Sequence, residues 1–83
     1  MTPMSYRTDA GVVTALVLTP GRKWLPIITL GCPIKIRKVA LAEQRFMTPL
    51  DYPVKRAVRK YIAAGRRLGI TKGARKALRE VLS

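Results

Sequence analysis

VKRAVRKYIAAGRRLGITKGARKALREVL, residues 54–82, is the stretch that decides how the second half of this chain folds. Its first part predicts an amphipathic helix, because apolar and small residues recur at the i, i+3, i+4 and i+7 spacing that gathers them on one helical face. Those residues are Val54, Ala57, Val58, Tyr61, Ile62, Gly65 and Leu68. Pro53 suits the first helical position, and Gly69 suits the residue just after a helix. We therefore expect a helix that begins at Pro53 and ends at Gly69.

A second helix should follow directly. Thr71 is a favoured N-cap, because its hydroxyl can accept a hydrogen bond from a free backbone N–H of the first turn. The apolar stripe of this helix consists of Ala74, Ala77, Leu78 and Val81. Residues 54–83 are therefore expected to form two amphipathic helices joined by a turn around Gly69.

The first half of the chain has the composition of β-strands. Three segments are rich in β-branched or apolar residues and are separated by Pro and Gly, namely 12–19, 24–30 and 34–41. We expect them to form a three-stranded antiparallel β-meander, or part of a small barrel, with residues 6–8 as a candidate fourth strand. Pro26 has no N–H to donate, so its strand is expected at an edge of the sheet or at a bulge.

A connector should join the two halves. Pro49 and Pro53 disfavour helical geometry in the residues that precede them. Three apolar side chains are expected to hold this connector over the sheet: Phe46, Met47 and Leu50. The chain is thus predicted to be one α+β domain, with a β-meander (1–41), a connector (42–53) and a basic helical hairpin (54–83).

Charge is the dominant feature of the composition. The 83 residues include 17 Lys and Arg against 4 Asp and Glu, for a formal net charge of +13. The excess positive charges repel one another in the folded state and attract polyanions. The candidate partners are nucleic acid, an anionic membrane or an acidic protein surface.

Several classes of chemistry lack the residues that they need. The chain has no histidine and a single cysteine, Cys32, so it has no Ser-His or Cys-His pair and no zinc-finger spacing. Its four carboxylates are scattered along the sequence, and it has no glycine-rich nucleotide-binding motif. We therefore expect no enzyme activity, no catalytic residues, no metal site and no cofactor.

The positive charge is concentrated in the predicted helices. Between Tyr52 and Arg79 there are ten Lys and Arg residues and no acid. They are Lys55, Arg56, Arg59, Lys60, Arg66, Arg67, Lys72, Arg75, Lys76 and Arg79. Like charges at i, i+4 destabilise a helix by about 0.2 to 0.5 kcal/mol per pair, so a solvated helix usually intersperses Glu among its Lys and Arg. Phosphates would remove this penalty, and these ten residues are therefore predicted to bind nucleic acid.

The turn between the helices adds a second signal. AAGRRLGITKGARKAL, residues 63–78, resembles a helix-turn-helix, with Gly69 in the turn and Leu68 and Ile70 as flanking apolar anchors. It departs from that pattern at Arg75, where the second helix usually presents an aliphatic side chain. The resemblance implies that the second helix enters the major groove and that the first contacts the DNA backbone.

The β half offers further candidate ligands for phosphate. Lys35 and Arg37 alternate with isoleucines, so they are expected on an outer face where they extend the basic surface of the helices. Arg22 and Lys23 precede Trp24, the only tryptophan. Trp24 is expected to be a core aromatic residue, and the alternative is that it stacks on a splayed base.

We expect a small, basic, non-enzymatic protein that binds nucleic acid. DNA is favoured over RNA because the cations lie on helices, and contacts to phosphates are expected rather than base readout. The alternative is a small regulatory protein, of the kind that a virus directs at a host polymerase or nuclease, which docks on an acidic patch of the larger enzyme. The apolar run near residue 12 is too short to span a membrane, and a lone cysteine fits a reducing compartment, so a cytoplasmic protein is expected.

Overall fold

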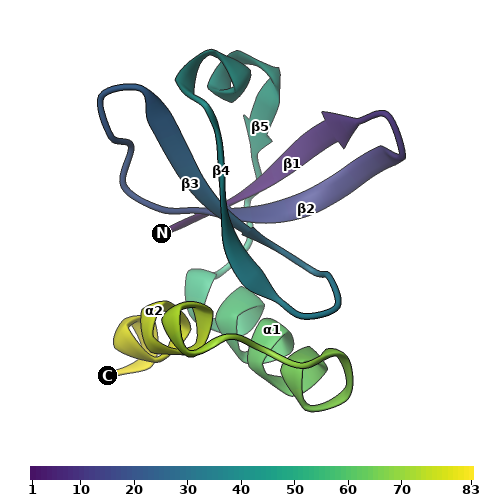
Figure 1. Ribbon diagram of the computed structural model, residues 1–83, viewed down its shortest axis with the longest axis vertical. Helices are drawn as coiled ribbons and strands as arrows, with labels where there is room; N and C mark the ends of the chain where they lie inside the picture. Colours follow the sequence, from purple (N-terminus) through teal and green to yellow (C-terminus); the bar gives the residue numbers. More distant parts are fainter.

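The computed structural model describes all residues, 1–83, as an α+β protein in which one antiparallel sheet lies against two helices (Figure 1). The elements are β1 (Thr2–Thr8), β2 (Gly11–Val17), β3 (Trp24–Thr29), β4 (Lys35–Ala40), the 3-10 helix η1 (Leu41–Phe46), β5 (Met47–Pro49), α1 (Val54–Leu68) and α2 (Lys72–Leu82). The five strands follow the order β4-β3-β2-β1-β5. The predicted α+β class and the order of a β half followed by two helices are confirmed.

The sheet has five strands, so the predicted three-stranded meander is incomplete. The three predicted strands correspond to β2, β3 and β4. β1 extends the candidate fourth strand back to Thr2 and pairs with β2 through a tight hairpin in which Thr8 faces Gly11. β5 lies within the predicted connector and pairs with residues 4–6 of β1. A three-residue strand that ends in proline has too little pattern to be recognised in a sequence.

Pro26 does not place its strand at an edge, because β3 lies between β4 and β2. The ladder between β2 and β3 ends at the pair Val17–Ile27, and Pro26, the residue that precedes Ile27, lies just beyond it. Beyond that point only the carbonyl oxygen of Pro26 is used, and it accepts a hydrogen bond from the N–H of Leu18 at 3.0 Å. The missing N–H therefore falls where the β2–β3 ladder ends, so a proline is tolerated in a central strand and the expected edge position is wrong.

Apolar side chains are buried on both faces of the sheet. On one face, Leu16 and Ile28 pack with residues of α1 and α2, such as Val58 and Leu78. The other face holds a smaller cluster of Val17, Leu25, Ile27 and Met47. η1 connects the two edge strands, β4 and β5, in six residues. At about 2 Å per residue, η1 is too short to cross the width of a flat five-stranded sheet. The sheet is therefore curled around its second cluster.

The two helices begin and end close to the predicted residues. Pro53 is the N-cap of α1 rather than its first residue, and its carbonyl accepts the first helical hydrogen bond, from Ala57, at 3.1 Å. Gly69 follows α1 with φ +82°, as the sequence predicts. Thr71 caps α2, because its side-chain oxygen accepts a hydrogen bond from the N–H of Ala74 at 3.3 Å.

The turn between the helices is bound to the sheet. The N–H of Ile34 donates to the carbonyl of Gly69 at 2.8 Å, and the N–H of Thr71 donates to the carbonyl of Ile34 at 3.0 Å. A Cβ on Gly65 would lie 3.2 Å from the Cβ of Ile70, so a residue without a side chain lets the turn pack tightly on α1. These contacts fix the start of α2 relative to β4.

The connector is held less firmly than expected. Met47 is buried, as predicted, but Phe46 is 52% exposed and Leu50 is 36% exposed. The guanidinium of Arg45 lies over the Phe46 ring at 4.7 Å. The expectation that all three apolar residues pin the connector is therefore wrong for Phe46 and Leu50.

Candidate nucleic-acid interface

Every lysine and arginine of the chain is exposed to solvent. None of the side-chain hydrogen bonds involves a lysine or an arginine. One carboxylate accepts a hydrogen bond: Glu43, from the hydroxyl of Tyr6 at 3.1 Å. The protein's own acids therefore leave the positive charge uncovered.

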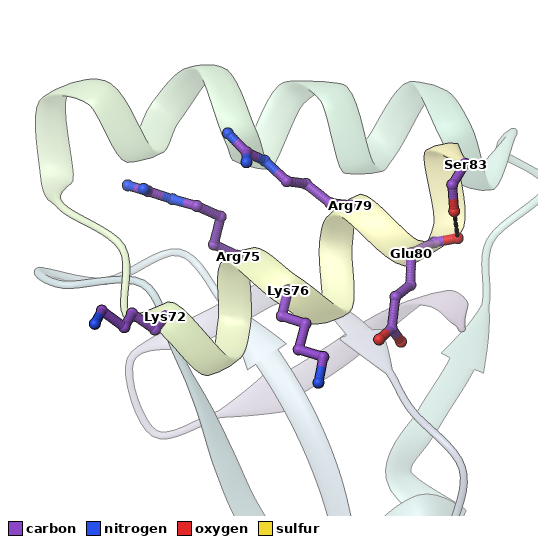
Figure 2. A pocket seen from close by; sticks show the side chains of 6 residues that line it. All are labelled: Lys72, Arg75, Lys76, Arg79, Glu80 and Ser83. Carbon is purple, nitrogen blue, oxygen red and sulfur yellow. Dashed lines mark hydrogen bonds between the residues drawn. The ribbon is translucent and has the colours of Figure 1, made fainter.

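The α2 cations follow one exposed stripe of the helix, from which their side chains spread in two directions. Lys72, Arg75, Lys76 and Arg79 line a shallow open hollow of about 460 Å³ with Glu80 and Ser83. Figure 2 shows Arg75 and Arg79 extending on the side of α1, whereas Lys76 and Glu80 point to the opposite side of α2. The one carboxylate of this region therefore points away from the two guanidinium groups.

The α1 cations form two separate rows. With 3.6 residues per turn, Lys55, Arg59 and Arg66 fall on one flank of the helix, and Arg56, Lys60 and Arg67 fall on the other. Lys60 lines a hollow with Leu30 and Tyr52, at the side of α1 that faces the strand ends. The flank of Arg59 is therefore the one that lies toward α2.

A joint basic surface results where the two helices run side by side. Figure 2 shows α2 turning back along α1, in the arrangement of a helical hairpin. We call this the helix surface, and it consists of Lys55, Arg59, Arg66, Lys72, Arg75, Lys76 and Arg79. Arg75 is exposed, so the position at which a helix-turn-helix usually has an aliphatic anchor is not a core position here.

The other α1 row does not join this surface. Arg56, Lys60 and Arg67 are exposed on the far flank, and the guanidinium of Arg56 lies over the Tyr52 ring at 5.5 Å. Of the ten helical cations predicted from the sequence, the four of α2 line one hollow, and helical periodicity places three of α1 on the adjoining flank and these three on the far one. A helical wheel of α1 separates the two rows, but only the position of α2 shows which row adjoins it.

Lys35 and Arg37 do not extend the helix surface. Ile36 faces α2, because its Cδ1 atom lies 4.0 Å from the position of a Cβ on Gly73. Since side chains alternate along a strand, Lys35 and Arg37 point to the opposite face of the sheet. Arg37 there lines a hollow with Tyr6 and Val39. The expected continuity with the helices is wrong, and any role of these two residues in binding stays a prediction.

One cation that was not predicted to bind, Lys38, lies on the helix side of β4. Lys38 shares the face of Ile36 and lines a shallow hollow of about 470 Å³ with Arg22, Lys23 and Trp24. The alternation of side chains along β4, counted from Ile36, would have predicted this position of Lys38. The predicted faces of Ile34, Lys35, Ile36 and Arg37 follow this alternation, but the prediction did not continue it to Lys38.

Trp24 is 53% exposed, so the expectation that it is a core aromatic residue is wrong. It is the first residue of β3 and pairs with Ala40 at the end of β4 that points away from the helices (Figure 1). The helices therefore do not cover it. Leu25, Ile27 and Ile28 fill the core positions of this strand instead.

Two tyrosines have perturbed hydroxyl groups, and neither belongs to the helix surface. Burial raises the pKa of Tyr61 to about 12, and its hydroxyl donates to the carbonyl of Thr14 at 2.8 Å. Burial, followed by the hydrogen bond to Glu43, raises the pKa of Tyr6. Both groups keep their protons at neutral pH and serve the packing of the sheet.

No three His, Cys, Asp or Glu side chains come together as a metal site. Neither helix is both long enough and apolar enough to cross a membrane. No protein-family model, curated protein or solved structure matches the chain.

Proposed function

We propose that this protein binds nucleic acid without catalysis, and that its helix surface contacts the phosphates of duplex DNA. The observation that supports this is the row of four exposed cations along α2, beside the flank of α1 on which helical periodicity places three more. None of these seven donates a hydrogen bond to a carboxylate. The spacing of the cations on two packed helices gives a fixed array rather than a flexible tail. A backbone of regularly spaced phosphates is the polyanion that such an array fits best.

The helix surface is unfavourable without a partner. Lys72 and Lys76, Arg75 and Arg79, and Lys55 and Arg59 are like charges at i, i+4, and each such pair costs about 0.2 to 0.5 kcal/mol. Bound phosphates would offset this repulsion, and binding would release the counterions condensed on DNA. The same charge would speed association at low salt.

Salt titration of duplex binding tests this proposal. If about four to six phosphates are engaged, log K should fall with log salt at a slope of roughly −4 to −5. The double variant Arg75→Gln/Arg79→Gln should lose about two contacts, which lowers the magnitude of that slope by about 1.8. Fluorescence anisotropy of a labelled duplex measures both quantities. A slope near zero for the native protein would contradict duplex binding.

The chain supplies a matched control. Arg56→Gln/Arg67→Gln removes the same charge from the other flank of α1, away from the helix surface. It should change the slope by clearly less than the α2 variant does. Equal losses from the two double variants would show that the attraction depends on net charge alone and not on the helix surface.

The same cations would also suit an acidic protein surface, which is the alternative that the sequence leaves open. Capture of partners from a lysate before and after nuclease treatment separates the two. Loss of all partners after nuclease supports the proposal. One stoichiometric protein that stays bound through the helix surface would contradict it and favour a regulatory protein that docks on a larger enzyme.

A further inference from the structure

A second candidate binding surface lies at the far end of the β3–β4 ribbon. Trp24 is 53% exposed there, and the shallow hollow beside it is lined by Arg22, Lys23 and Lys38 and by no carboxylate. We call these four residues the Trp24 surface. α2 packs near Ile36, whereas Trp24 pairs with Ala40 at the opposite end of β4, so this surface is separate from the helix surface.

The backbone under Trp24 is held in place. The N–H of Gly21 donates to the carbonyl of Trp24 at 2.9 Å, and the N–H of Leu41 donates to the carbonyl of Lys23 at 3.1 Å. Lys38 lies on the same face as Trp24, because it pairs with Pro26, two residues further along β3. The backbone positions that carry the aromatic ring and the cations are therefore fixed relative to one another before any ligand binds.

The ring of Trp24 is also free of the protein's own cations. The cation–π contacts of this structure join Arg45 to Phe46 and Arg56 to Tyr52, and neither involves Trp24. A large aromatic side chain left in water on a rigid strand is an unusual use of the single tryptophan in a protein with so small a core. A flat, aromatic and negatively charged ligand matches both of its features at once.

We propose that the Trp24 surface binds an unpaired nucleotide of a single-stranded nucleic acid. The base stacks on the indole ring, and the adjoining phosphates contact Lys38 on one side and Arg22 and Lys23 on the other. Duplex DNA does not fit this surface, because its bases are stacked inside the helix and expose no flat face. The inference rests on its own residues and stands or falls separately from duplex binding by the helix surface.

Fluorescence tests it directly, because Trp24 is the only tryptophan and its emission reports on this surface alone. A short oligothymidylate should quench that emission in a saturable manner. Heparin, a polyanion without bases, should bind but leave most of the emission unquenched. A blunt duplex should give the same result. Equal quenching by heparin and oligothymidylate would overturn base stacking. A change of emission with protein concentration alone would show instead that Trp24 is covered by a second copy of the chain.

Variants separate stacking from charge. Trp24→Ala should weaken binding of labelled oligothymidylate on the order of tenfold, whereas Trp24→Phe, which keeps a flat ring, should lose less. Lys38→Gln should weaken binding more than its matched control Lys35→Gln, which removes a charge from the opposite face of β4. An unchanged affinity in Trp24→Ala would overturn the proposal.

The two proposals fail in different ways. Trp24→Ala should leave the affinity for duplex DNA unchanged, and Arg75→Gln/Arg79→Gln should leave the quenching amplitude at saturation unchanged. Absence of duplex binding together with saturable quenching by oligothymidylate would reject the helix surface alone. The reverse result would reject the Trp24 surface alone.

Discussion

Replacement of Gly69 by alanine tests whether the turn between the helices depends on a backbone conformation that only glycine adopts easily. Gly69 has φ +82° and ψ 154°, a region that is essentially restricted to glycine. A Cβ there would lie 3.5 Å from the Cβ of Pro33, which is an ordinary van der Waals distance. The cost of Gly69→Ala therefore comes from the backbone and not from a clash.

Its magnitude follows from the hydrogen bonds that prevent the turn from relaxing. The N–H of Gly69 donates to the carbonyl of Gly65 at 2.8 Å, and its own carbonyl accepts from the N–H of Ile34 at 2.8 Å. Rotation of Gly69 out of its conformation would break one or both of these bonds. We expect a loss of about 1 to 3 kcal/mol in the free energy of unfolding. In a domain of this size that corresponds to a fall in Tm of roughly 5 to 20 °C.

Gly73 provides the matched control for the same chemical change. It lies in the first turn of α2, and the only atom near an added Cβ is Cδ1 of Ile36, at 4.0 Å. Gly73→Ala should therefore raise stability, by up to about 1 kcal/mol, through helix propensity alone. Urea unfolding of both variants, followed by circular dichroism, measures the two effects. Shifts of the same sign, or a neutral Gly69→Ala, would refute the reasoning.

Two further outcomes test the core and its buried phenol. Leu78 is fully buried between α2 and the sheet, so Leu78→Ala should cost about 2 to 5 kcal/mol, whereas Val12→Ala, at a side chain that is 64% exposed, should change the free energy of unfolding by no more than about 0.5 kcal/mol. Similar losses in the two variants would contradict the placement of the core. The pKa of Tyr61 is raised from 10.0 to about 12, so the folded state holds the phenol proton more tightly than the unfolded chain does. Its stabilising effect is complete below about pH 10 and is lost as the pH rises from about 10 to 12. Urea midpoints across this range should fall more steeply for the native protein than for Tyr61→Phe, and parallel profiles would show that Tyr61 is not responsible.

The bound turn matters for the proposed function. Because Ile34 bonds to both Gly69 and Thr71, α2 begins at a fixed place beside β4. Arg75 and Arg79 are thereby held on the α1 side of the helix rather than carried on a mobile arm (Figure 2). Because the backbone is already fixed, binding a regular row of phosphates orders only the side chains of these cations.

The sequence by itself determined the elements whose signals are local. The apolar spacing in residues 54–68, Gly69 after α1 and the Thr71 cap each depend on neighbours within a few residues, and the structure confirms all three. The three central strands were predictable for the same reason, since their β-branched runs and the breaks between them are contiguous. The exposure of the helical cations also follows from local periodicity, because a charge opposite an apolar stripe faces solvent.

Only the tertiary structure decided how those elements meet. β5 exists because η1 brings Met47 back to β1, and no local pattern reports a pairing across so many residues. Trp24 is exposed because the helices lie at the other end of the ribbon, and Lys38 rather than Lys35 shares the face of α2 because of how that helix sits on β4. The spacing of residues along the sequence shows which side of a strand or helix each one occupies. Which neighbour covers that side depends on contacts between distant parts of the chain, and the spacing does not reveal those contacts.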